Sequence, residues 1–505
     1  MKNNIIKKCN NEKYFYTVLL LITVLALFLM LRSGSYTGLW NDEFSTIASL
    51  HLYDMSMIEW LESTVSANGL STNFFMIIAR VWIEIGPRND IWLMILTALM
   101  VAVAVYFVGL VGRLIYGGMA GIVSAVLFGF SYYVFEVSHE FRFYPWLVLV
   151  TVLSLYFFCK LTISRDVKVR YIILFGLAMG LAVNGQILAG FLPIWFFIVD
   201  IVLVVLHKKQ KKSLFSYVIA APFGVILFSH YMIRYATDDQ DVYLFKIMDP
   251  SVTNLIQMPK FMIGDSAPLL VLLYLSIALA LLFVLGKAYK KQYFALMAEK
   301  ITLPDQRKQF LFALIAISPW VCVLMNFIMI KATGETANMF APRYFQYLYP
   351  LVYLSIGITV TYIITSILKV KRGIVFALAI ALVLYFAPQT YVASLTNPMY
   401  PGVKYGVEWI LDQQEEIGSD VTVLAPLYSA AQAQVMYDFY FNGKVLAGTV
   451  EVKNSLGRED INDINTETVA LFSSDRTIAL ETLLAEKYKK DELSGSGITI
   501  WRRVD

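Results

Sequence analysis

Charged residues are scarce in this sequence: Asp, Glu, Lys and Arg make up 15% of its 505 residues, whereas 58% are hydrophobic. Soluble globular domains usually carry about 25% charged residues. This scarcity excludes a cytosolic enzyme, a disordered regulator and a fibrous protein. The net charge of +4 is too balanced to indicate a nucleic-acid partner. The composition is typical of a polytopic membrane protein.

Cysteine is also scarce, with three residues in all. Cys159 and Cys322 fall in apolar segments and Cys9 in the N-terminal tail, so nothing indicates a disulfide framework or a thiolate metal site. The first apolar stretch, residues 14–31, lacks a small-residue cleavage site and ends in Arg32. Because it is long enough to cross a membrane, we expect a retained first span rather than a signal peptide.

Long apolar runs fill most of the remaining chain. Runs of roughly 18 or more mostly apolar residues predict transmembrane helices. Eleven are present, near residues 14–32, 90–112, 117–134, 145–163, 171–185, 187–206, 214–235, 267–287, 309–330, 347–368 and 373–391. Their cores are almost free of acids, Asp200 being the main one. The shorter run 73–85 is amphipathic and contains Arg80 and Glu84, which predicts an interfacial or re-entrant helix.

The positions of Lys and Arg support this count. If the N-terminus is cytoplasmic, every basic cluster between the eleven spans lies on the cytoplasmic side, as the positive-inside rule requires. Counting 73–85 as a span would reverse all later loops. We therefore expect a multi-pass plasma-membrane protein with a cytoplasmic N-terminus and an extracytoplasmic C-terminal segment.

The composition changes to that of a soluble domain after about residue 395. Helical periodicity and short strand patterns alternate there. The helices are expected at 405–413 and 477–488, and the strands at 421–425, 469–472 and 498–501. The sequence thus predicts two domains, an all-α polytopic membrane domain (1–394) and a small α/β extracytoplasmic domain (395–505).

Asp42 and Glu43 lie in the first of three outer segments with ionisable residues, just after the first span. Adjacent carboxylates at the exit of a span repel one another and are partly desolvated, which suits proton, metal or nucleophile chemistry. The alternative is a helix N-terminal cap, with Asn41 or Asp42 as the cap residue and the acids facing the helix dipole.

The second and third outer segments carry arginine beside tyrosine. The second runs from Ser138 to Pro145, where a loop ion pair between Glu140 and Arg142 is the alternative to a functional cluster. In the third, residues 331–349, Arg343 is suited to clamp a phosphate because guanidinium offers a planar fork of donors. The alternative is a snorkelling interfacial arginine. An acid pair and two arginines on one face indicate a reaction in which an acceptor is deprotonated while a phosphate leaves.

The pair Asp42-Glu43 resembles the acidic pair of the GT-C superfamily of integral membrane glycosyltransferases. The likeness is to bacterial relatives of dolichyl-phosphate-mannose–protein mannosyltransferase (family 39) and of the lipid A aminoarabinose transferase. The segment with Arg142 and Tyr144 is similar to the family, as is 341–344 (Ala-Pro-Arg-Tyr). The stretch 73–85 matches the family's juxtamembrane helices.

This resemblance implies a GT-C fold and transfer of a sugar from a polyprenyl-phosphate donor to an extracytoplasmic lipid, glycan or protein acceptor, with inversion. Asp42 would be the base and Glu43 would orient it. The residues implied for the donor phosphate are Arg142, Arg343, Lys331 and Arg234. Those implied for substrate contact are His139, Glu140, Tyr144 and Tyr344. No cofactor or metal is expected, because the second loop lacks the D-x-D of the metal-dependent oligosaccharyltransferase branch. A bound divalent metal ion remains an alternative.

Two other functions remain as alternatives. A transporter or flippase of envelope lipids would show inverted repeats and acids at mid-membrane. An O-antigen-ligase-like enzyme would carry a long outer loop late in the chain.

Overall fold

The structure is a computed structural model. It describes residues 2–52, 55–68, 74–164, 167–205, 209–224, 251–288, 306–332, 340, 342–370, 372–396, 403–413, 420–425, 430–441, 450–454, 464, 466–472, 481–482, 484–495 and 498–504.

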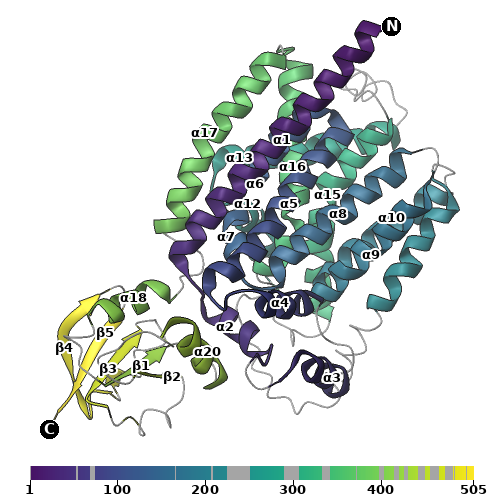
Figure 1. Ribbon diagram of the computed structural model, residues 1–505. Coiled ribbons are helices and arrows are strands. Elements are labelled where there is room, and N and C mark those ends of the chain that lie inside the picture. The colour runs from purple at the N-terminus through teal and green to yellow at the C-terminus, as the bar shows by residue number, and fades with distance from the viewer. Residues whose placement is uncertain are drawn as a thin grey trace.

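Long helices run side by side in one bundle, and a small sheet domain lies at one end of it, away from the N-terminus (Figure 1). We call the bundle end that faces the sheet domain the site end. The bundle helices are α1 (Lys2–Thr37), α5 (Asp90–Tyr116), α6 (Gly118–Gly129), α7 (Tyr132–His139), α8 (Phe143–Ile163), α9 (Val169–Gly185), η1 (Ile187–Gly190), α10 (Phe191–Val205), η2 (Lys211–Leu214), α12 (Val252–Ile263), α13 (Ala267–Ala288), α15 (Gln306–Ala332), η3 (Pro342–Leu348), α16 (Tyr349–Tyr362), η4 (Ile363–Ile367) and α17 (Arg372–Thr396). Three short helices lie between α1 and α5, namely α2 (Asn41–Ala48), α3 (Met57–Asn68) and α4 (Phe74–Ile85).

Within the described residues, eight helices are long and apolar enough to cross a membrane, or nine if the bent pair α6–α7 is one span. The multi-pass helical architecture is therefore confirmed. Eight of the eleven predicted spans coincide with these eight helices. The run 117–134 corresponds to α6 and α7, bent by 61°, and 171–185 is α9, a shorter helix of 17 residues. The run 214–235 lies partly outside the described residues, so the count of eleven stays a prediction.

The predicted interfacial helix at 73–85 is α4, which has 12 residues. Its Arg80 is buried: one Nη donates to the Leu50 carbonyl, and the other donates to the Met55 carbonyl at 2.7 Å and pairs with Glu84 at 2.9 Å. Because these carbonyls belong to the loop after α2, Arg80 anchors that loop at the site end.

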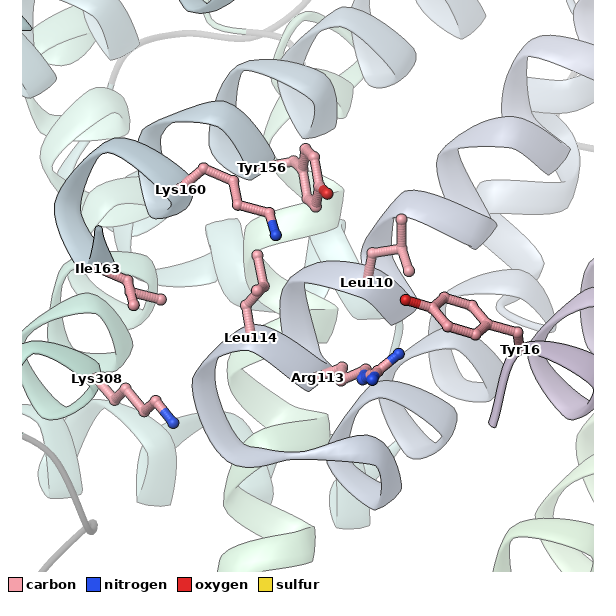
Figure 2. Close-up of a pocket in the computed structure, with 8 residues that line it drawn as sticks. All are labelled: Tyr16, Leu110, Arg113, Leu114, Tyr156, Lys160, Ile163 and Lys308. Atoms are coloured by element: carbon pink, nitrogen blue, oxygen red, sulfur yellow. The ribbon is translucent and has the colours of Figure 1, made fainter. Parts of the chain in front are cut away.

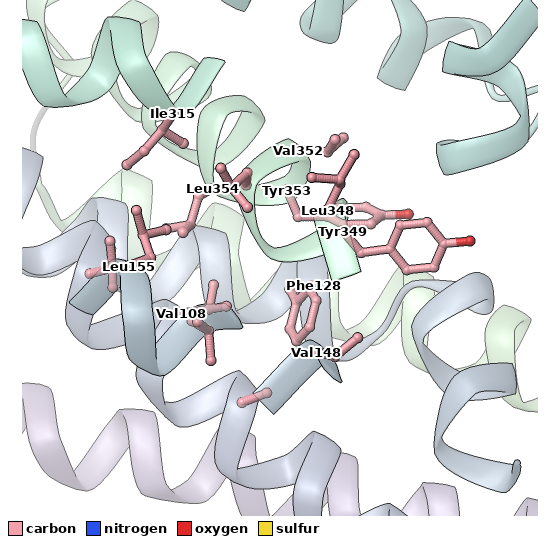
Figure 3. Close-up of a cluster of buried hydrophobic side chains, with 14 of the residues drawn as sticks. Val108, Phe128, Val148, Leu155, Ile315, Leu348, Tyr349, Val352, Tyr353 and Leu354 are labelled. Atoms are coloured by element: carbon pink, nitrogen blue, oxygen red, sulfur yellow. The ribbon is translucent and has the colours of Figure 1, made fainter. Parts of the chain in front are cut away.

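The centre of the bundle is a continuous apolar core. Side chains of α5, α6, α8, α15 and α16 meet there, among them Val108, Phe128, Leu155, Ile315 and Tyr353 (Figure 3). Most of the residues in the apolar parts of α5, α8, α15 and α16 are buried inside the bundle. The core fixes the ends of α8 and α16, and these ends carry the candidate site.

Helices α5 and α6 approach one another through glycines. A Cβ on Gly121 would lie 2.3 Å from the Gly109 carbonyl oxygen. Small residues let transmembrane helices pack backbone to backbone, so this contact needs glycine at position 121.

The acid predicted within the apolar runs, Asp200, is buried on α10 and ion-paired. Lys209 Nζ donates to both of its oxygens at 2.7 and 2.8 Å, and the Tyr217 hydroxyl donates at 3.1 Å. These contacts close the turn after α10, which is a structural role.

The C-terminal segment forms a five-stranded sheet of order β2-β1-β3-β5-β4, in which β1 is parallel to β2 and β3 and β5 is antiparallel to β3 and β4. The three predicted strands are confirmed. The predicted helix at 477–488 lies partly outside the described residues, and Tyr488 begins β4. The elements are α18 (Lys404–Asp412), β1 (Val421–Ala425), α20 (Ala430–Tyr440), β2 (Val450–Asn454), β3 (Thr468–Phe472), β4 (Tyr488–Gly495) and β5 (Ile498–Arg503).

The sheet domain packs on the segment that follows α1. The Leu39 N–H donates to the Tyr440 hydroxyl at 2.8 Å, and the Leu39 carbonyl accepts from the Val403 N–H at 2.9 Å. Lys404 pairs with Asp90 at 2.9 Å. The α2 side chains share one hydrophobic core with α18 and α20, so this domain holds α2 in place.

Candidate active site

The candidate site lies where α2, the loop between α7 and α8, and η3 meet. The chain leaves helical geometry at Ser131 (ψ 135°) and again at Glu140 (ψ 111°). Helix α7 is thereby held between two breaks, and residues 139–142 are turned toward α2. The acids of α2 thus meet residues that lie about 100 positions later in the sequence.

Glu43 is the third residue of α2, and its side chain closes a capping box with the N-cap residue Trp40. Its Oε2 accepts from the Trp40 N–H at 2.8 Å, and its Oε1 accepts from the Phe141 N–H. Burial raises the pKa of Glu43 to about 8, against the opposing effect of these two backbone donors. The alternative that Asn41 or Asp42 caps the helix is therefore wrong, because the N-cap is Trp40. Glu43 closes the capping box and also joins α2 to the loop after α7.

Asp42 points instead at two arginines. Its Oδ2 accepts from Arg142 Nη1 and, at 3.0 Å, from Arg343 Nη1. The side chains of Asp42, Arg142 and Arg343 are each about one fifth exposed, at 18%, 19% and 23% respectively. Its Oδ1 accepts no hydrogen bond from the residues described. One oxygen of the carboxylate is thus held by two guanidiniums, and the other has no donor among the described residues.

Each arginine lies over a tyrosine of its own segment. The Arg142 guanidinium is 5.4 Å from the centre of the Tyr144 ring, and that of Arg343 is 5.3 Å from the centre of the Tyr344 ring. Tyr144 is only 1% exposed. The rings orient the guanidiniums by cation–π contact, so the tyrosines predicted to bind substrate contact the arginines here.

Glu140 is buried behind this cluster. Its Oε1 accepts from Gln346 Nε2 at 3.2 Å, while its buried Oε2 has no hydrogen-bond partner among the described residues. Burial raises the pKa of Glu140 to about 8, although Arg142 acts in the opposite direction. Arg142 forms its ion pair with Asp42 and, among the described residues, not with Glu140, so the alternative of a Glu140–Arg142 loop ion pair is wrong.

Gln346 was not predicted. It follows Arg343 by three residues in the 3-10 helix η3, where residues i and i+3 lie on one face. That spacing was the available signal.

Among the other predicted residues, His139 contacts α1 rather than this cluster. His139 Nε2 is 2.8 Å from Ser33 Oγ and 3.1 Å from the Met30 carbonyl oxygen, contacts that hold α7 against α1. Lys331 is exposed at the end of α15. Arg234 lies outside the described residues. Roles for these three in binding stay predictions.

The cluster carries surplus positive charge at neutral pH. Two guanidiniums face one carboxylate, Asp42, since the raised pKa values of Glu43 and Glu140, both about 8, keep these two acids mostly protonated at pH 7. The sum is one net positive charge. Such a site suits a singly charged anion such as a phosphodiester.

An apolar cavity of about 570 Å³ opens nearby, between α6, α7, α12, α13, α16 and α17. Tyr132 and Tyr133 line it at the start of α7. Since α7 rises about 1.5 Å per residue, its far end at His139 is about 10 Å away. The cavity is therefore within reach of a ligand held at Arg142.

The comparisons with known proteins agree with this architecture. The family described as dolichyl-phosphate-mannose-protein mannosyltransferase matches residues 74–233, less than half of the chain. No curated protein matches the sequence.

Two solved structures resemble the whole chain. ArnT from Cupriavidus metallidurans bound to undecaprenyl phosphate has a TM-score of 0.53 and 11% identity, covering 96% of this chain and 98% of that one. The Archaeoglobus fulgidus oligosaccharyltransferase in complex with Zn and sulfate has a TM-score of 0.50 and 12% identity, covering 96% and 73%. Both likenesses concern the fold. The chain has the GT-C fold of integral membrane glycosyltransferases, as its resemblance to that superfamily predicted.

Proposed function

We propose that the protein is a membrane glycosyltransferase that moves a sugar from a polyprenyl-phosphate donor to an acceptor outside the cytoplasm. The observation that carries this proposal is the single carboxylate Asp42 held between Arg142 and Arg343. It joins a proton acceptor and a phosphate-binding pair in one site, on the fold shared with ArnT.

The arginines would bind the donor phosphate. A sugar phosphodiester carries one negative charge, which matches the net positive charge of the cluster. As the bond to the sugar breaks, the leaving polyprenyl phosphate gains negative charge, and fixed guanidiniums stabilise this change more than they stabilise the bound donor. The leaving group needs no general acid for that reason.

Asp42 Oδ1 would take the proton of the acceptor. The acceptor oxygen then bonds to the anomeric carbon while the carbon–oxygen bond to phosphate breaks on the opposite side, so the configuration inverts in one displacement. A single base suffices for this reaction. Glu43 has a positioning role, because its two backbone hydrogen bonds fix the helix that carries Asp42.

The apolar cavity beside α7 would take the part of the polyprenyl chain next to the phosphate. Ligand sites are commonly cavities of about 300–1,000 Å³ with mostly apolar walls, and this one is about 570 Å³. Its openness between helices lets the remaining chain lie in the bilayer. No metal or other cofactor enters this mechanism.

The site end would face the outside of the cell membrane. Ser45 on α2 and Lys168 before α9 are both exposed and lie at opposite ends of the bundle. In the proposed orientation, an impermeant thiol reagent labels Ser45→Cys on intact cells and does not label Lys168→Cys. The reverse pattern would contradict the orientation.

The decisive test is Asp42→Asn in a transfer assay with purified protein and polyprenyl-phosphate-linked sugar. Asn keeps the size of Asp but does not accept the proton, so turnover should fall by roughly 10²–10⁴-fold. Donor binding should persist or tighten, because the two arginines lose their carboxylate. Asp412→Asn, at an exposed acid of α18, is the matched control. Near-normal turnover by Asp42→Asn would remove Asp42 as the base.

A further inference from the structure

The end of the bundle opposite the site holds a second cavity, of about 340 Å³, which is lined by both charged and apolar side chains. Four helices contribute to it: α1 with Tyr16, α5 with Arg113, α8 with Lys160 and α15 with Lys308 (Figure 2). Apolar side chains complete the wall, and the lining residues not yet named are Leu110, Leu114, Tyr156 and Ile163.

The cavity lies at the far membrane interface. Lys160 follows Phe143, the first residue of α8, by 17 residues, which corresponds to about 26 Å along the helix. A bilayer's hydrocarbon core is about 30 Å thick. If the site end lies at one interface, Lys160 lies at the level of the other, where phospholipid headgroups begin.

The described residues compensate the positive charge in this cavity only in part. Glu12 is the carboxylate that pairs with Arg113, at 3.2 Å through Nη2. Arg113 Nη1 is buried with no hydrogen-bond partner among the described residues. Lys160 Nζ lies 5.4 Å from the centre of the Tyr156 ring. Three cations thus surround one space with one half-exposed acid at its edge.

We propose that this cavity binds the phosphate headgroup of an anionic phospholipid from the leaflet opposite the active site. The cations would hold the phosphate, and the Tyr16 and Tyr156 hydroxyls are placed to donate to its oxygens. The apolar wall of Leu110, Leu114 and Ile163 would take the glycerol and the first acyl carbons.

The combination of cationic and apolar lining residues favours a phospholipid over free inorganic phosphate. Basic pockets between transmembrane helices are suited to lipid headgroups, whereas the apolar residues of the wall offer nothing to a free inorganic anion. A bound lipid would join α5, α8 and α15 at an end where their own charges repel one another. It would therefore stabilise the bundle without touching the reaction site.

A simpler interpretation is that Arg113 and Lys160, which lie in the last turns of α5 and α8, only complement the helix dipoles. That interpretation predicts no selective ligand. The two interpretations differ in whether the cavity cations bind lipid more strongly than equal charges elsewhere on the same end.

The experiment counts phosphatidylglycerol bound to the detergent-purified protein by native mass spectrometry and measures the thermal midpoint with added lipid. Each cation contributes about 1 kcal/mol to anionic-lipid binding, or roughly fivefold, so Lys160→Gln with Lys308→Gln should weaken binding about thirtyfold. The control is Lys168→Gln with Arg170→Gln, which removes two exposed cations at the same end. The control should bind like the wild type.

Three results would overturn the proposal. These are equal phosphatidylglycerol occupancy in the Lys160–Lys308 variant and the wild type, an equal loss in the control variant, and equal protection by phosphatidylcholine. Adding inorganic phosphate at millimolar concentration tests whether the bound anion is a phospholipid headgroup or free phosphate. Protection by phosphate as large as that by phosphatidylglycerol would replace the lipid by a free anion.

Discussion

Donor binding should weaken as the pH rises from 7 to 9, because Glu140 loses its proton in that range. Burial raises the pKa of Glu140 to about 8, so at pH 7 the protonated form exceeds the ionised form roughly tenfold, and at pH 9 the ratio is reversed. Ionised Glu140 would cancel the one net positive charge of the arginine–aspartate cluster. If only the protonated form binds phosphate well, the dissociation constant rises about tenfold over these two pH units, or about 1.4 kcal/mol.

The assay is titration of a short-chain polyprenyl phosphate into purified protein at pH 7, 8 and 9. The second proton of a phosphate monoester leaves near pH 6, so the ligand changes little in this range. Glu140→Gln keeps an uncharged group of similar shape beside Gln346, so it should lose the part of the pH dependence that belongs to Glu140 and keep only the part contributed by Glu43, whose pKa is also about 8.

The control is Glu43→Gln, which leaves Glu140 in place. It should keep the part of the pH dependence that belongs to Glu140. Loss of affinity by Glu140→Gln as steep as in the wild type would refute the assignment. A flat wild-type profile would show that Glu140 does not change its protonation state between pH 7 and 9.

Three further outcomes follow from the packing and the charges. Arg343→Lys keeps the charge but loses the planar fork, so titration should show a donor affinity weaker by about 1.5–3 kcal/mol. If Arg343→Ala binds the donor with wild-type affinity, Arg343 is only a snorkelling residue at the membrane interface. Asp200→Asn leaves Lys209 charged and buried, which costs about 3–5 kcal/mol and should lower the thermal midpoint, and adding Lys209→Gln should recover part of this loss. Gly121→Ala would place a methyl group 2.3 Å from a backbone oxygen of α5 and should lower the thermal midpoint. Gly118→Ala should lower it less, because the nearest atom to its methyl group is a ring carbon at 3.2 Å.

The membrane architecture was predictable from the sequence because apolar length alone decides which segments cross a bilayer. Helix α4 was predictable for the same reason, since 12 residues are too few to cross. The bend between α6 and α7 was not predicted, because Gly129 and Ser131, which lie at the break, are also common inside continuous transmembrane helices. Both halves of that run have the composition of one continuous span.

The candidate site was predictable as residue types on one face but not as contacts. Asp42 is separated from Arg142 by 100 residues and from Arg343 by 301, and no local pattern reports such pairings. The division of roles between the two acids, with Glu43 capping α2 and Asp42 facing the arginines, depends on the chain direction at Trp40. Gln346 was missed because its three-residue spacing from Arg343 has a meaning only once the segment is known to be a 3-10 helix beside the buried Glu140.

The hydrogen bond from Leu39 to the Tyr440 hydroxyl joins residues 401 positions apart, and this has a consequence for the timing of biogenesis. Ribosomes add about 5–20 residues per second, so Tyr440 leaves the ribosome roughly 20–80 s after Leu39. During that interval α2 lacks α18 and α20, with which it shares a core, and Asp42 lacks Arg343 as well. A nascent chain without the sheet domain would therefore have no transfer activity. Pulse–chase labelling should detect protease-resistant α2 only after the sheet domain has been translated.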